Sequence, residues 1–304
     1  MVERYTYSGV TWVDVFEPTV DEARALMQEF SIRPSIAEEM LAPSIRAKTE
    51  RFDDLLYLVL YFPALRHTNS QQSDQEVDFI LGRDFLITVR YDTVDALHKF
   101  SKLFEVRAIL GREDEEPHAG HIFSALIMKL YRSIGHELDH LHDRLEEAEE
   151  EIFAGHEREM VIELSKISRD LLNIKQALTP HKEILESLRP AAHELFGDAF
   201  HDELTLLSNE YYRVTTLRNT NADSLRELRI TNDSLLSTKQ NEITKNLTIL
   251  AFLTFPLSVA AGIFGMNAVN MPIVGGEHDF LILITLMLIA TALTFLYFKY
   301  KRWI

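Results

Sequence analysis

Two short stretches of the sequence carry residue types whose spacing could do chemistry. The first, His136-Glu137-x-x-His140, matches a pattern in which two imidazoles on one helix face bind zinc and the glutamate acts as a general base. The second, Gly265-Met266-Asn267, ends an apolar segment, where a Gly-Asn pair can also simply terminate a helix. The first motif predicts a metal-dependent hydrolase, whereas three residues alone predict no function for the second.

The setting of the first motif argues against a hydrolase. Its helix is heavily charged, whereas a catalytic zinc helix usually lies in a protein core, and neither Glu159 nor Glu163 stands in the context of a third zinc ligand. Histidine is also frequent nearby, at His118, His121 and His142, so a chance match is easy. The motif therefore indicates an exposed helix face, with incidental metal binding or a membrane metalloprotease as the alternatives.

Two long segments without charge occupy the end of the chain. No Asp, Glu, Lys or Arg occurs from Asn246 to Gly276 or from Phe280 to Phe298. Each segment has the roughly 20 residues that cross a hydrocarbon core. We therefore predict an integral membrane protein with transmembrane helices at 247–266 and 280–298, joined by an external loop at 267–279.

The distribution of lysine and arginine predicts the orientation of these spans. Lys239 and Lys245 precede the first span, the basic tail 299–304 follows the second, and the loop contains neither residue type. By the positive-inside rule both termini are cytoplasmic, in an inner or plasma membrane that the chain crosses twice. Besides this topological role, the tail could form a basic collar of Lys299, Lys301 and Arg302 around an ion path.

Composition excludes several classes of partner and site. The chain of 304 residues has a net charge of -16, which argues against nucleic acid and is compatible with cations. It contains no cysteine, which excludes disulfides and thiolate metal sites. Divalent cations, the bilayer and further copies of the chain are partners that this composition permits but does not by itself identify.

The first part of the chain, 1–120, has the pattern of a cytoplasmic α/β domain. Thr19 and Glu22 form a capping box that opens an amphipathic helix, and Ser35 is the expected cap of a second, short helix. Leu55 to Phe62 is apolar and rich in residues that favour strands, and two further strands flank Gly82-Arg83-Asp84 as a hairpin.

Long helices follow this domain. Residues 121–196 predict a charged antiparallel helical pair interrupted near Gly155, and 197–246 predicts a stalk helix that continues into the first span. Heptad apolar residues begin the stalk, but Thr231–Ser234 and Ser237–Asn241 are polar where a dry coiled coil would have Leu or Ile. These polar residues are either exposed surface or, if several copies surround an axis, the wall of a wet funnel.

One face of the first span has small or hydroxylated side chains. At helical spacing its positions are Thr244, Leu247, Thr248, Ala251, Phe255, Ser258 and Gly262. Small residues also let helices approach closely, so the face could serve packing or line a pore. Two helices alone cannot enclose a polar path in lipid, so a pore requires an oligomer.

The arrangement of these motifs resembles the CorA family of magnesium channels. Gly265-Met266-Asn267 lies between two C-terminal spans, Met271-Pro272 follows it, and a basic tail ends the chain. The resemblance implies a funnel-shaped homopentamer, with Gly265, Met266 and Asn267 as the selectivity filter and Asn267 contacting the hydrated ion. A membrane-anchored scaffold would leave these features unexplained.

The family also implies an ion and its control. Magnesium, with cobalt or nickel as further ions, would enter down the membrane potential, and intracellular magnesium bound between subunits would close the channel; Asp233 is a candidate ligand. Phe264 and Ala268-Val269-Asn270 depart from the family pattern, and the acids of the loop are Glu277 and Asp279. Zinc-transporting relatives share Gly-Met-Asn, so a zinc transporter is the alternative.

Overall fold

The computed structural model describes residues 1–7, 9–64, 74–92, 94, 97, 100, 118–266, 278–301 and 303. The chain forms two compact units, Met1–Arg229 and Ile230–Ile304, and helix α7 (Ala199–Phe264) contributes to both. We describe each unit by itself.

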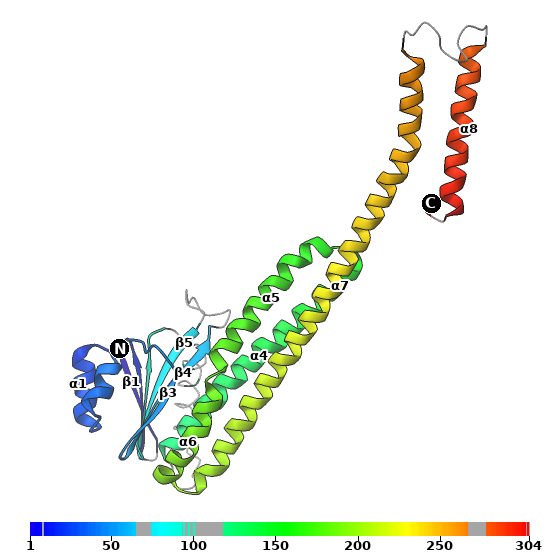
Figure 1. The fold of residues 1–304 in the computed structure, drawn as a ribbon. Coiled ribbons are helices and arrows are strands. Elements are labelled where there is room, and N and C mark those ends of the chain that lie inside the picture. Colours follow the sequence, from blue (N-terminus) through cyan, green and yellow to red (C-terminus); the bar gives the residue numbers. More distant parts are fainter. Residues whose placement is uncertain are drawn as a thin grey trace. The chain divides into compact units, whose positions relative to one another are not determined.

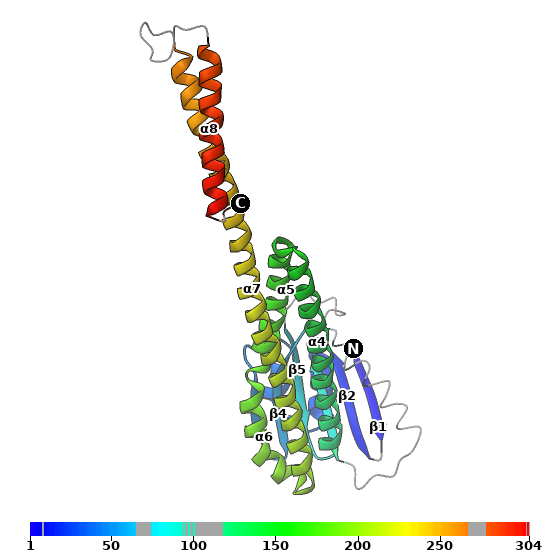
Figure 2. The same ribbon diagram turned by 90° about the vertical axis from the view of Figure 1, so that its right-hand side faces the viewer.

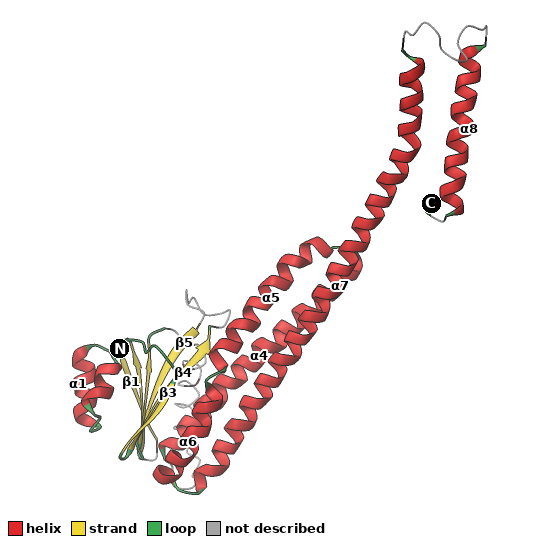
Figure 3. Ribbon diagram, viewed as in Figure 1, coloured by secondary structure: helices red, strands yellow, loops and turns green. Residues whose placement is uncertain are grey.

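The first unit is built on a six-stranded mixed sheet (Figures 1 and 3). Its strands are β1 (Val2–Tyr7), β2 (Val10–Phe16), β3 (Lys48–Phe52), β4 (Leu55–Pro63), β5 (Asp74–Leu81) and β6 (Phe85–Arg90). They lie in the order β1-β2-β6-β5-β4-β3, and only the β2–β6 pair is parallel. The predicted hairpin is confirmed, because β5 and β6 pair antiparallel with Leu81 opposite Leu86.

Two short helices, α1 (Val20–Glu29) and α2 (Pro34–Glu39), cover one face of the sheet. The capping box of α1 is confirmed: the Glu22 amide donates to the Thr19 hydroxyl, and the Thr19 amide donates to the Glu22 carboxylate. The prediction that Ser35 caps α2 is wrong. The cap is Arg33, because Pro34 takes the first helical position, where its fixed φ and missing N–H cost nothing.

Helices α4 (Ala119–Ala154), α5 (Glu157–Leu178) and α6 (His181–Phe196) contact the strands from the other side (Figure 2). Gly155 ends α4 with a φ of 100°, at the predicted interruption. The region predicted as a helical pair holds three helices, because Pro180 separates α5 from α6.

Buried histidine His181 ties these layers together. Its Nδ1 lies 2.9 Å from the Tyr131 hydroxyl on α4, and its Nε2 lies 2.8 Å from the Tyr61 carbonyl on β4. A neutral imidazole satisfies both contacts by donating from Nε2 and accepting at Nδ1. Burial accordingly lowers the pKa of His181 to about 4.

The beginning of α7 packs on the same helices through its apolar heptad positions. Leu204, Leu207, Tyr211, Val214, Leu225 and Leu228 are all buried. Polar groups secure the contact: the Asn221 amide donates to the Leu138 carbonyl at 2.7 Å, and Arg218 Nε donates to the Leu171 carbonyl at 3.2 Å.

The second unit contains the end of α7 and helix α8 (Asp279–Tyr300). Both are long and apolar enough to cross a membrane, and their apolar windows are almost entirely exposed in the chain. Helix α7 ends at Phe264, and α8 runs antiparallel to it within this unit (Figures 1 and 2).

Candidate ion pathway

Within the second unit, the less exposed side chains of α7 and α8 recur every three or four residues. On α7 they are Ile249, Leu253, Leu257, Ala260 and Phe264, and on α8 they are Leu283, Met287, Thr291, Thr294 and Phe298. Phe298 contacts the Phe252 ring with centroids 6.2 Å apart, and it stacks on Trp303 at 5.7 Å. This periodicity defines one packed stripe on each helix.

The residues of the predicted pore lie on the opposite side of α7. At 3.6 residues per turn, the centre of the predicted pore face lies roughly half a turn around the helix from the stripe that contains Ile249. The positions of this face are Thr244, Ala251, Phe255, Ser258 and Gly262. These five positions are exposed, as is Leu247, while Thr248 is half-buried. The chain therefore leaves this face uncovered while α8 occupies the other.

Hydroxyl groups along α7 are bonded to the helix itself. Thr244 donates to the Gln240 carbonyl at 2.8 Å, Thr248 to Thr244 at 2.7 Å, and Ser258 to Thr254 at 3.0 Å. Each hydroxyl retains lone pairs that can accept from water. The face can therefore present oxygen acceptors to a hydrated ion without leaving a donor unsatisfied in the membrane.

The two glycines at the end of α7 have different roles. A Cβ at Gly265 would lie 2.9 Å from the Ala261 carbonyl oxygen, which accepts the Gly265 amide at the same distance. A Cβ at Gly262 would meet nothing within 4 Å in the chain. Gly265 is thus required by the local turn, whereas Gly262 leaves open space on the uncovered face.

Several predicted site residues lie outside the described residues or have side chains that are not described. Asn267, Glu277 and Arg302 fall outside the described ranges, and Asp279 is placed only as the first residue of α8. Of the predicted filter, Gly265 and Met266 follow α7 directly, and the Met266 side chain is 64% exposed.

Charged candidates near the spans are exposed. Asp233 on α7 and the tail residues Lys299 and Lys301 are each open to solvent in the chain. Within the described ranges, no three His, Asp or Glu side chains converge as a metal site. Any metal held by Asp233 would therefore need ligands from elsewhere.

The His136-Glu137-x-x-His140 motif lies on α4, with both histidines exposed and the intervening Leu138 buried. The imidazoles point away from the core that buries Leu138, as expected for an exposed helix face. No third ligand joins them among the residues that the structure describes.

Comparison with known proteins decides between the two motifs. Residues 7–302 match the family of CorA-like Mg2+ transporter proteins, which is nearly the whole chain. The chain belongs to the CorA family. CorA proteins are transporters rather than enzymes, so the hydrolase interpretation of His136-Glu137-x-x-His140 is excluded.

Individual relatives agree with this assignment. The cobalt/magnesium transport protein CorA of Thermotoga maritima is 23% identical over 299 residues, covering 98% of this chain and 84% of the relative. The structure of the CorA magnesium transporter of Methanocaldococcus jannaschii superposes with a TM-score of 0.82 at 20% identity, over 97% of this chain and 92% of that one. The ZntB cytoplasmic domain of Vibrio parahaemolyticus shares the fold of the first unit less closely, with a TM-score of 0.60 at 16% identity over 76% of this chain and 88% of that chain.

The match places the observed elements within a CorA fold. That fold combines an N-terminal mixed α/β domain, a long stalk helix and two apolar C-terminal helices, all of which this chain has. This CorA protein is accordingly a membrane protein whose Gly265-Met266-Asn267 motif follows the first apolar helix.

Proposed function

We propose that this CorA protein is a homopentameric channel that carries Mg2+ into the cell, with Co2+ and Ni2+ as further substrates. The observation that carries the proposal is the uncovered face of α7 that contains Thr244, Ser258 and Gly262, opposite the stripe that packs toward α8. One chain cannot enclose a polar path in lipid, so the faces of several copies must meet around an axis.

The outer end of this path would be a ring of Asn267 side chains. Magnesium gives up its water reluctantly, so amide oxygens that hydrogen-bond its hydration shell can select it without full dehydration. Gly265, which has no room for a Cβ, would hold the backbone turn that presents the asparagine. Met266 and Asn267 complete the filter.

The membrane potential would drive uptake. A divalent ion gains about 4.6 kcal/mol per 100 mV, twice the approximately 2.3 kcal/mol of a single charge. The orientation with both termini in the cytoplasm is supported by Lys299, Lys301 and Arg302 after the last helix and by a loop without Lys or Arg. The same tail would form the basic collar at the inner mouth.

Intracellular Mg2+ would regulate the channel by bridging carboxylates of neighbouring subunits. Exposed Asp233, which lacks a cation partner within the described part of the chain, is a candidate ligand of this kind. Binding would favour the closed arrangement, and loss of the ion would release it.

Ion flux into vesicles that contain the purified protein tests the proposal. We expect Mg2+ uptake that requires an inside-negative potential and is lost in Asn267→Ala, while Asn270→Ala, a matched change in the same loop, keeps most of the flux. Measuring Co2+, Ni2+ and Zn2+ in the same vesicles decides the ion. Flux of zinc alone would show that the chain is a zinc transporter instead, and flux that follows a proton gradient would overturn the proposed channel driven by the membrane potential.

A further inference from the structure

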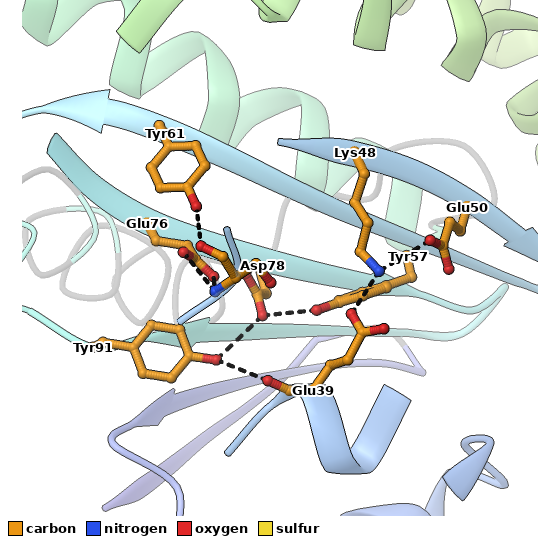
Figure 4. Close-up of polar contacts among 9 residues, drawn as sticks. Glu39, Lys48, Glu50, Tyr57, Tyr61, Glu76, Asp78 and Tyr91 are labelled. Carbon is orange, nitrogen blue, oxygen red and sulfur yellow. Dashed lines mark hydrogen bonds and ion pairs between the residues drawn. The ribbon is translucent and has the colours of Figure 1, made fainter. Parts of the chain in front are cut away.

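A group of buried polar side chains lies between the sheet and the chain that follows α2 (Figure 4). Asp78 on β5 is fully buried and Glu76 is nearly so. The cation drawn in this group in Figure 4 is Lys48, which binds Glu39 at 2.6 Å and Glu50 at 3.0 Å. Within the described residues, neither Asp78 nor Glu76 forms an ion pair. Buried carboxylates ordinarily have a cation as partner, so the negative charges of Asp78 and Glu76 need another source of neutralisation.

The buried carboxyl group of Asp78 has too few hydrogen-bond donors around it to satisfy both of its oxygens. Tyr57 donates to Asp78 Oδ2 at 3.0 Å. The Tyr91 hydroxyl lies 3.4 Å from the same oxygen and 3.1 Å from the Met40 carbonyl, but its single proton serves only one of them. Asp78 Oδ1 is buried and has no donor among the described residues. A proton on the carboxyl itself removes the shortage.

Glu76 lies two residues before Asp78 on β5, so the two side chains share one face of the strand. The two oxygens of Glu76 accept from the Ser44 amide at 2.8 and 3.0 Å. Burial, followed by the charge of Glu76, raises the pKa of Asp78 well above its ordinary range, whereas hydrogen bonds from Tyr57 and Tyr91 act in the opposite direction. Asp78 is therefore the member of the pair that holds the proton.

The same group of residues fastens the segment between α2 and β3, residues 40–44. Glu76 accepts the Ser44 amide, Tyr61 donates to the Ser44 carbonyl, and Tyr91 contacts the Met40 carbonyl. Each of these three anchors belongs to the polar group around Asp78 (Figure 4). Two negative charges in this group would repel each other in a low-dielectric site and weaken the attachment.

We propose that a proton on Asp78 Oδ1, shared with Glu76, fastens residues 40–44 to the sheet, and that this segment opens as the proton is lost. The charged and titratable groups that face the pair come from every neighbouring element. They are Glu39 from α2, Lys48 and Glu50 from β3, Tyr57 and Tyr61 from β4, Asp74 from β5 and Tyr91 after β6. Among them only Lys48 is a cation, and its partners are the two glutamates.

The direction of the pH effect follows from proton linkage. When the segment opens, Asp78 reaches water and returns to its ordinary pKa, so opening releases the proton. The closed state is therefore favoured at low pH and weakens as pH rises toward the raised pKa of the closed form. This proton-dependent attachment of residues 40–44 does not depend on transport, so it can be refuted while the channel proposal stands.

Hydrogen exchange of residues 40–44 in the full chain, solubilised in detergent, tests this attachment. Between about pH 6 and about pH 8, we expect protection in the unmodified protein to fall as pH rises, by at most about tenfold per pH unit, after correction for intrinsic exchange. In Asp78→Asn, whose amide can donate to Glu76 permanently, protection should not change with pH. Glu50→Gln, a carboxylate change at the rim of the same group, should keep the slope of the unmodified protein.

A pH-independent protection in the unmodified protein, or the same slope in Asp78→Asn, would overturn the proposal. Infrared spectroscopy of the unmodified protein with carboxyl-labelled aspartate gives a second test that requires no folded Asp78 variant. We expect a band from a protonated aspartic acid near neutral pH, and its absence would also refute the proposal.

Discussion

The two units of this CorA protein bury their side chains in different ways. In the first unit, both aromatic and polar side chains lie in the interior and have defined partners. Phe123 packs against Phe79, and His181 lies between the Tyr131 hydroxyl and the Tyr61 carbonyl. In the second, most large apolar side chains are exposed, and Phe298 is among the few that are buried. The first unit completes its core within one chain, whereas the second leaves its apolar surface for lipid or, in the proposed oligomer, for further copies to cover.

Removing a phenylalanine from each unit should therefore have unequal effects. Phe123 is fully buried and meets Phe79 edge-on at 5.4 Å, so Phe123→Ala should lower the free energy of unfolding by about 3–5 kcal/mol. Phe298→Ala should cost about 1 kcal/mol or less, because lipid is as apolar as the site that the side chain leaves.

The two tryptophans separate these outcomes, since Trp12 lies in the first unit and Trp303 in the second. Denaturation followed by Trp12 fluorescence, in a Trp303→Phe background, should shift for Phe123→Ala and stay unchanged for Phe298→Ala. Equal shifts would show that the two units do not unfold separately.

Acid should destabilise the first unit through His181. Because burial lowers its pKa from the ordinary 6.5 to about 4, the folded state binds fewer protons than the unfolded state, and stability falls as pH drops through this window. At about 1.4 kcal/mol per pKa unit, the loss is about 3 kcal/mol at most. The difference in unfolding free energy between pH 7 and pH 4 should be smaller in His181→Gln by that order; an equal difference would contradict the assigned role.

The contrast between the units also explains which parts of the fold were predictable from sequence. The capping box at Thr19, the hairpin at Gly82 and the charge-free segments are local patterns, and each corresponds to an observed element. The cap of α2 was mispredicted because Pro34, rather than Ser35, determines where that helix begins. Long-range pairings, such as parallel β2 with β6, have no local signature.

The candidate pathway was predictable to a similar degree. Helical spacing alone identified the face of α7 that contains Thr244, Ser258 and Gly262, because a helix repeats every 3.6 residues. It could not show that α8 leaves that face uncovered, since the packed stripe depends on contacts between segments distant in sequence. No motif marks the buried group around Asp78, because its members come from separate strands that only the fold brings together.

Placing a bulky apolar side chain on the uncovered face tests its function as a pore wall. Ser258→Leu should narrow and dry the path, lowering Mg2+ flux by about tenfold or more, which corresponds to a barrier at least about 1.4 kcal/mol higher. Val259→Leu is the matched control, because its side chain lies about 100° further around the helix. Similar losses of flux in both variants would indicate a packing role for this face. As a control, unfolding of the first unit followed by Trp12 fluorescence should be unchanged in both variants.

The smallest expected difference concerns how helices of the two units begin. Thr19 accepts the Glu22 amide at the start of α1, so Thr19→Ala should cost the first unit about 1 kcal/mol. At the start of α8, His278 makes no capping hydrogen bond through its side chain, so His278→Ala should change stability little. The Thr19 backbone amide and then the Thr19 hydroxyl lower the pKa of Glu22, and Thr19→Ala removes the second of these. Part of the Thr19→Ala cost should therefore disappear in acid, where Glu22 is protonated in both proteins. Thermal unfolding of the unmodified protein, of each single alanine variant and of the double variant, at neutral and acid pH, measures the cost of losing the cap and the part of it that depends on pH. A larger loss from His278→Ala than from Thr19→Ala would show that α8 depends on its own terminus more than on the membrane around it.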